Sequence, residues 1–162
     1  VPAPPQESRS YDLFGVGGVG EFGGDVLFVR YAGSAIPRQL YPAWGGGYYY
    51  AVRRKGDPAA PLALLYASRW STPERAANFA AIYAAGLSKR YLHVQDVPED
   101  GQQPAVETAA LDHLTGKRTW LTEDGPVVID VQGDTVMATE SLDPATTEKL
   151  QQEVFGMAAA AK

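Results

Sequence analysis

Residues 44–79 read WGGGYYYAVRRKGDPAAPLALLYASRWSTPERAANF and contain strand, turn and helix signals in a fixed order. Aromatic and β-branched residues favour a strand over Tyr48 to Arg54. A second strand is predicted over Leu62 to Trp70, because side chains of a strand alternate between two faces and both sets here are mostly apolar. One set is Leu62, Leu64, Tyr66 and Trp70, and the other is Ala63, Leu65, Ala67 and Arg69. The link over 55–61 contains Gly, Asp and Pro, so the two strands are expected to form a hairpin.

A helix is predicted to begin directly after this hairpin. Ser71 or Thr72 can cap it, and Pro73 suits the first helical position. Glu74 favours the positive end of the helix dipole. Gly86 is expected to end the helix. Apolar residues at helical spacing form one stripe, which consists of Ala76, Phe79, Ala80, Tyr83 and Leu87.

The rest of the chain predicts further strands and a final helix. A short strand is expected over 90–94, and three more over 117–122, 127–131 and 135–139, with turns at 123–125 and 132–134. Asp143 and Pro144 predict the start of the last helix, whose Leu150, Val154 and Met157 are expected to face inward. This order predicts an α+β fold, with a mainly antiparallel sheet and two helices packed on one face.

The expected organisation is one domain with two loose ends. Residues 1–10 predict a flexible, proline-rich N-terminal arm, residues 11–158 a single α+β domain, and residues 159–162 a frayed tail. At 162 residues the chain is long enough for one buried core. The first residues, VPAPPQ, lack the features of a signal peptide and are typical of a processed end, a linker or a cloning boundary.

Composition excludes several classes of function. The net charge of −5 argues against nucleic acid and anionic membrane surfaces as partners, because both require a cationic surface. No apolar run reaches the length of a membrane span, so no direct membrane crossing is expected. The absence of cysteine excludes disulfides, thiolate metal sites and cysteine nucleophiles.

No pattern in the sequence predicts a catalytic residue, a cofactor or a metal site. The two histidines, His93 and His113, are too few for a zinc site, which usually needs three or four protein ligands. No serine lies in a nucleophile-elbow pattern, although a Ser-His-Asp assembly forms in space and cannot be read from spacing. The motif G-x-G-x-x-G over 15–20 lacks a following helix and the acidic residue of a dinucleotide site, so it is interpreted as a glycine-rich turn.

Aromatic residues are the strongest binding candidates. Three consecutive tyrosines on a strand must point to alternating faces. A partner-binding surface and core packing with hydroxyl groups at the rim both explain such a cluster. The candidate partner-binding residues are Tyr41, Trp44, Tyr48, Tyr49 and Tyr50. A candidate anion patch consists of Arg53, Arg54 and Arg69, with solvated strand ends as the alternative.

Four short elements stand out along the chain, and they are Gly20-Glu21-Phe22-Gly23, Trp44-Gly45-Gly46, Trp70-Ser71-Thr72 and Asn78-Phe79. Together they resemble the C-terminal region of some exported bacterial proteins, mostly without assigned function. In those proteins an upstream half resembles a zinc metallopeptidase with a His-Glu-x-x-His helix, which this sequence lacks. Gly47 and Tyr48 stand where the family motif Trp-Gly-Gly-Asp-Arg-Tyr has its charged pair, so any function of that pair is lost. The resemblance implies a non-catalytic domain.

The leading hypothesis is a non-enzymatic interaction domain that is exported to the periplasm or the cell exterior. It would be an accessory subunit or processed fragment, and it would bind a protein partner in a larger or membrane-associated assembly through the aromatic cluster. The alternative is a small-molecule-binding domain with a pocket between the first hairpin and the helix starting at Pro73. A hydrolase that uses His93 or His113 is the third hypothesis. Purification of the native protein would separate the first two, through co-purifying subunits or a bound small molecule.

Overall fold

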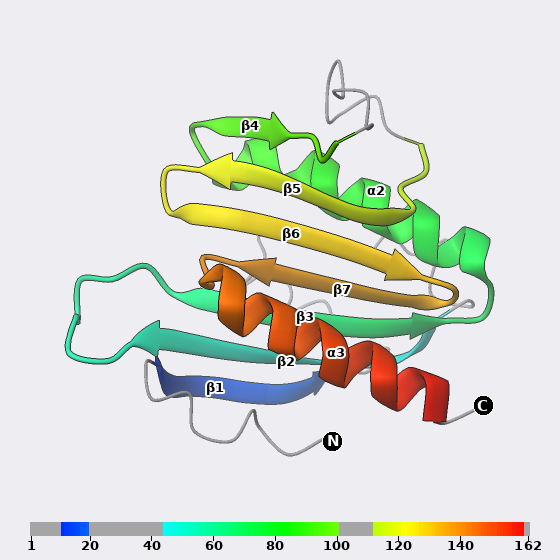
Figure 1. Cartoon of the computed structure of the whole chain (residues 1–162), viewed down its shortest axis with the longest axis horizontal. Coiled ribbons are helices and arrows are strands. Elements are labelled where there is room, and N and C mark those ends of the chain that lie inside the picture. Colours follow the sequence, from blue (N-terminus) through cyan, green and yellow to red (C-terminus); the bar gives the residue numbers. More distant parts are fainter. Residues whose placement is uncertain (1–10, 20–43, 101–111, 161–162) are drawn as a thin grey trace.

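A computed structural model describes residues 11–19, 44–100 and 112–160 of this chain. Seven strands form one sheet in the order β1-β2-β3-β7-β6-β5-β4, and every neighbouring pair is antiparallel (Figure 1). The predicted α+β class is therefore confirmed. The strands are β1 (Tyr11–Val19), β2 (Trp44–Arg54), β3 (Ala63–Trp70), β4 (Val94–Val97), β5 (Gly116–Thr122), β6 (Gly125–Gln132) and β7 (Thr135–Glu140), and the helices are α2 (Pro73–Arg90) and α3 (Pro144–Ala160).

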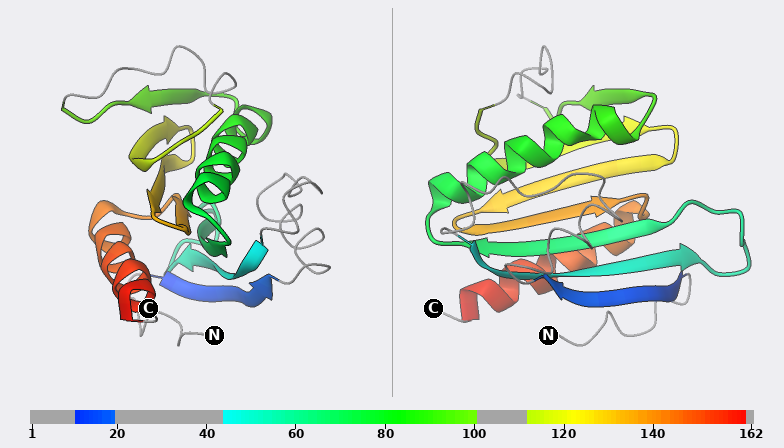
Figure 2. Two further views of the ribbon diagram at one scale, coloured as in Figure 1. Left: turned by 90° about the vertical axis from the view of Figure 1, so that its right-hand side faces the viewer. Right: turned by 180° about the vertical axis from the view of Figure 1, so that it is seen from behind.

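The two helices cover opposite faces of the sheet, so the expectation that both pack on one face is wrong (Figure 2). Helix α2 packs on the face that carries Leu64, and α3 packs on the face that carries Leu65. Because successive residues of a strand point to opposite faces, the apolar strand β3 places buried side chains on both sides. Each face must then be covered to remove its apolar surface from water.

The predicted hairpin is confirmed as β2 and β3, which pair with Tyr49 opposite Tyr66. The pairing register shifts between Trp44 and Gly47, as expected of a β-bulge. Gly46 has a φ of 107°, and a Cβ on Gly45 would lie 2.9 Å from the carbonyl oxygen of Arg69. Both glycines are therefore required where the chain enters β2.

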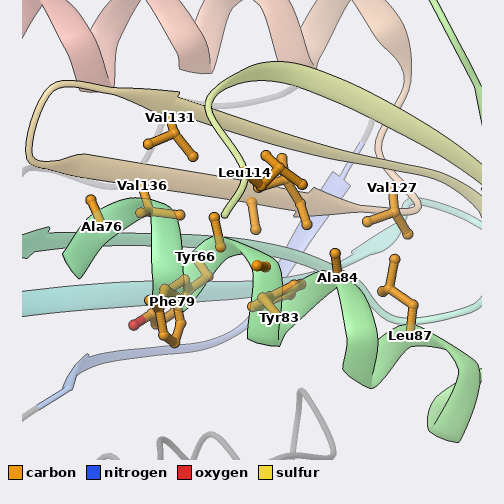
Figure 3. Close-up of a cluster of buried hydrophobic side chains, with 14 of the residues drawn as sticks. Tyr66, Ala76, Phe79, Tyr83, Ala84, Leu87, Leu114, Val127, Val131 and Val136 are labelled. Carbon is orange, nitrogen blue, oxygen red and sulfur yellow. The ribbon is translucent and has the colours of Figure 1, made fainter. Parts of the chain in front are cut away.

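Helix α2 begins as predicted. The side chain of Thr72 accepts a hydrogen bond from the Arg75 backbone N–H at 3.2 Å, and Pro73 is the first helical residue. Every member of the predicted apolar stripe is buried. Figure 3 shows this cluster, in which Phe79 lies against Tyr66 with ring centroids 5.6 Å apart.

Two expected boundaries near the end of α2 are wrong. The helix does not end at Gly86, which is buried within it, but continues to Arg90. The backbone N–H of Tyr91 then caps the helix by donating to the carbonyl of Leu87 at 2.9 Å. The strand expected over 90–94 instead begins at Val94.

The C-terminal half follows the prediction closely. Strands β5, β6 and β7 occupy the three predicted ranges, and their turns contain Gly125 and Gly133 at positive φ. Leu150 and Val154 of α3 are buried, whereas the side chain of Met157 lies outside the described part of the chain. The helix reaches Ala160, beyond the residue where fraying was expected. The expected arm over 1–10 also lies outside the described residues.

Candidate functional site

Three connections meet at one end of the sheet and form a partly open pocket of about 290 Å³. They are the link from β2 to β3, the turn from β5 to β6, and the link from β7 to α3. We call this cavity the rim pocket. Its wall consists of Tyr11, Arg54, Asp57, Ala60, Pro61, Asp124, Pro126, Ser141, Leu142, Asp143 and Pro144.

The position of the rim pocket differs from the expected one. The pocket predicted from the sequence lies between the first hairpin and the helix starting at Pro73. The hairpin link does contribute, but the helix at the pocket is α3, which starts at Pro144. The reason is the length of β3, whose eight residues separate the link from the start of α2 by roughly 26 Å.

Ser141 is the most unusual residue of the rim pocket. Its φ is 61°, in the left-handed region, where no other non-glycine residue lies within the described ranges. Its backbone N–H donates to the carbonyl of Pro126 at 2.8 Å. Its hydroxyl oxygen is buried and has no hydrogen-bond partner in the described part of the chain. Unfavourable backbone conformations of this kind cluster at functional sites, where the surrounding structure compensates for their cost.

Two charged side chains of the wall, those of Arg54 and Asp124, are exposed, and neither makes a hydrogen bond or an ion pair among the described residues. Asp57 uses one carboxylate oxygen to accept from the backbone N–H of Ala59 at 3.1 Å. Uncommitted charges beside a cavity are available to a ligand.

Asp143 has a structural role in the same wall. Its carboxylate accepts from the backbone N–H of Thr146 at 2.9 Å and from the Tyr11 hydroxyl at 3.0 Å. Burial tends to raise the pKa of Asp143, but the hydrogen bonds from Thr146 and Tyr11 outweigh it and hold this pKa below its usual value. Burial raises the pKa of Tyr11. Asp143 therefore remains ionised, caps α3 and joins it to β1.

A buried polar cluster surrounds Glu140, the residue that precedes Ser141 in the chain. Glu140 is 2% exposed, and both of its carboxylate oxygens accept from Nη1 of Arg90, at 2.7 and 2.8 Å. The hydroxyls of Tyr83 and Tyr91 also donate to it, the latter at 2.5 Å. Burial, followed by the charge of Glu140, raises the pKa of both tyrosines. With these donors in place, Glu140 anchors the end of α2 to β7 and is poorly placed to accept a proton from a substrate.

The structure separates the predicted aromatic cluster. Tyr49 is 8% exposed on the α2 face and Tyr50 is 2% exposed on the α3 face, so core packing, the alternative explanation, applies to these two. Tyr48 is half-buried and lies edge-on to Tyr50 at 5.6 Å. The side chain of Trp44 and the whole of Tyr41 lie outside the described part of the chain.

The predicted anion patch is not assembled. Arg53 and Arg54 end β2 at the rim pocket, whereas Arg69 lies near the other end of β3, where it pairs with Asp134 at 3.3 Å. About six residues of strand, roughly 20 Å, separate the two positions. The segment Gly15–Val19, interpreted as a glycine-rich turn, instead belongs to strand β1.

The histidines do not form a site with one another or with the rim pocket. His93 and His113 are both exposed, and neither belongs to the pocket wall. Among the described residues, no three His, Cys, Asp or Glu side chains are close enough to hold a metal ion. No helix in these ranges is both long and apolar enough to cross a lipid bilayer.

No pattern in the sequence predicts the rim pocket. The sequence predicts Asp57 and Asp124 in turns and Asp143 at the start of a helix. The only local signal for a site was their common position in connections next to predicted strands, since binding residues concentrate in such loops.

Comparisons of this chain with protein-family models, with curated proteins and with solved structures found no match.

Proposed function

We propose that this chain is a non-enzymatic binding domain whose ligand occupies the rim pocket. The observation that carries the proposal is the pocket wall, in which the charged side chains of Arg54 and Asp124 are exposed and make no hydrogen bond or ion pair among the described residues. The volume of about 290 Å³ suits a small organic molecule, at the lower end of typical ligand pockets.

The arrangement supports binding rather than catalysis. A serine nucleophile needs a base within hydrogen-bond reach that takes its proton. The described wall of the rim pocket contains no histidine beside Ser141. The carboxylate of Asp143 is held by Thr146 and Tyr11, so it serves the fold.

Filling the pocket tests this proposal. Ala60→Phe places a large ring in the wall and should abolish the binding of small molecules identified with the wild-type protein by ligand-observed NMR. Ala59→Phe is the matched control, because Ala59 is exposed, adjacent and outside the wall. The control should retain every ligand. Equal binding by the two variants, or no ligand from a library of amines, acids, amides and sugars, would contradict the proposal.

A protein partner is the second candidate, and a different surface supports it. Leu121 of β5 is 50% exposed and Val97 of β4 is 42% exposed. Strand alternation and pairing place both side chains on the face of the sheet that carries α3. On this face, the packed residues of α3 belong to the cluster around β2, β3 and β7, and Leu121 and Val97 are not part of that cluster. An exposed apolar strip on an uncovered part of a sheet is a typical protein-binding surface. The expected export of the chain remains a prediction.

Introducing a negative charge into this strip tests the second candidate. If the native protein co-purifies with a stoichiometric subunit, Leu121→Glu should remove that subunit while the sheet remains folded by circular dichroism. Thr119→Glu changes the neighbouring same-face position and is expected to weaken the contact less. Retention of the subunit by Leu121→Glu would place the interface elsewhere.

A further inference from the structure

We infer that the rim pocket selects a small organic cation of the alkylammonium class. This inference rests on the proposed binding function and adds the chemistry of the ligand. Three carboxylates, of Asp57, Asp124 and Asp143, and one guanidinium, of Arg54, line the cavity. The wall therefore carries an excess of negative charge, which concentrates cations and excludes anions in a partly enclosed site.

The three carboxylates differ in how many hydrogen bonds they already accept within the protein. Asp143 is committed to the N-terminus of α3 and to Tyr11. Asp57 accepts one bond from Ala59, and Asp124 has no side-chain partner in the described ranges. Asp124 follows β5 and lies beside Gly125, whose Cβ position is 3.4 Å from Cα of Ser141. Asp124 is therefore the carboxylate of the wall best placed to receive an ammonium, because it is exposed and its side chain makes no hydrogen bond or ion pair among the described residues.

The arrangement favours an organic cation over a metal ion. No three carboxylate or imidazole groups in the described part of the chain are close enough to coordinate one ion. The remaining wall is apolar and can pack against an alkyl chain, as occurs in pockets that combine hydrophobic walls with a few polar groups. Its apolar members are Ala60, Pro61, Pro126, Leu142 and Pro144.

Amide NMR with three matched probes tests the inference. Butylammonium, 1-butanol and butyrate have the same alkyl chain but carry a positive charge, no charge and a negative charge. Butylammonium should give saturable shifts at the amides of Gly125, Ser141 and Leu142, and the other two should not. Nα-acetyl-lysine methylamide, compared with its Nε-acetylated form, reports whether a lysine side chain of a peptide fits as well as a free amine.

Three variants assign the binding to charge in the pocket. Asp124→Asn should weaken butylammonium binding at least about threefold, because it removes an attractive charge from an exposed turn. Asp112→Asn makes the same change at an exposed site outside the wall and should have no effect. Arg54→Gln removes the repelling charge and should strengthen the binding.

The outcomes separate this inference from the proposed function. Saturable binding of butyrate or 1-butanol, but not butylammonium, at the same amides would overturn the cation class and retain a binding pocket. Weaker butylammonium binding in both Asp124→Asn and Arg54→Gln would point to another charge arrangement and overturn the inference. If the wild-type protein binds none of the probes and no other small molecule, that result would contradict both this inference and the proposed function.

Discussion

At the scale of single residues, Glu140 is the side chain on which the polar contacts of the interior converge. Its carboxylate accepts from Arg90, Tyr83 and Tyr91 while it is almost fully buried. Glu140→Gln would leave the guanidinium of Arg90 buried without its counter-charge. We expect the free energy of unfolding, measured by urea denaturation, to fall by about 3–5 kcal/mol.

Two further variants provide the comparison for the loss of stability in Glu140→Gln. Glu148→Gln, on the exposed side of α3, should change the free energy of unfolding by less than about 0.5 kcal/mol. Tyr91→Phe removes one donor and should cost about 1–3 kcal/mol. A loss below about 1 kcal/mol for Glu140→Gln would show that the ion pair with Arg90 contributes little beyond its own desolvation.

Individual residues were predictable from sequence only where their role is local. The cap of α2 depends on neighbouring residues, and the sequence predicts Ser71 or Thr72 for it, of which Thr72 forms the cap. The contacts of Glu140 were missed because its partner Arg90 lies 50 positions away in the chain. The conformation of Ser141 is equally invisible, since nothing in its neighbours requires a positive φ.

At the scale of secondary-structure elements, Asp143 determines how α3 begins and what it touches. It accepts from the backbone N–H of Thr146 and from the hydroxyl of Tyr11 on β1. Asp143→Ala should therefore lower the free energy of unfolding by about 1–2 kcal/mol in chemical denaturation. The pKa of Asp143 is below its usual value in the folded state, so this stabilisation is present above pH 4 or so and is lost as the pH falls further.

The matched control for this prediction is Asp57→Ala, which changes another aspartate of the rim pocket that caps no helix. It should cost clearly less than Asp143→Ala at neutral pH. If the two variants are equally stable, the contacts of Asp143 with Thr146 and Tyr11 do not stabilise the start of α3.

The elements themselves were largely predictable, because hydrophobic periodicity and turn residues are local signals. The placement of the helices was not. Strand β3 contains apolar residues on both faces, such as Leu64 and Leu65, and that pattern already indicates a sheet buried on two sides. The predicted helix end at Gly86 is wrong because propensity favours a stop at glycine, whereas tertiary packing carries the helix to Arg90.

At the scale of the whole molecule, the buried tyrosines make the stability of the fold sensitive to high pH. Burial raises the pKa of Tyr48 to about 12, and it raises the pKa of further tyrosines on both faces of the sheet. Above the usual tyrosine pKa of about 10, the unfolded chain loses these protons while the folded chain keeps them. The further tyrosines are Tyr11, Tyr50, Tyr66, Tyr83 and Tyr91.

The free energy of unfolding should therefore be constant up to about pH 10 and fall as the pH rises further. Urea denaturation at a series of alkaline pH values measures how steeply the free energy of unfolding falls with pH. Tyrosinate absorbance should show one group of tyrosines that ionises only as the circular dichroism signal is lost. Tyr48→Phe should reduce the slope between about pH 10 and 12, because it removes one raised pKa. A flat stability profile to pH 12, or full tyrosine ionisation in the folded state, would show that water reaches these hydroxyls and that the two covered faces of the sheet open readily.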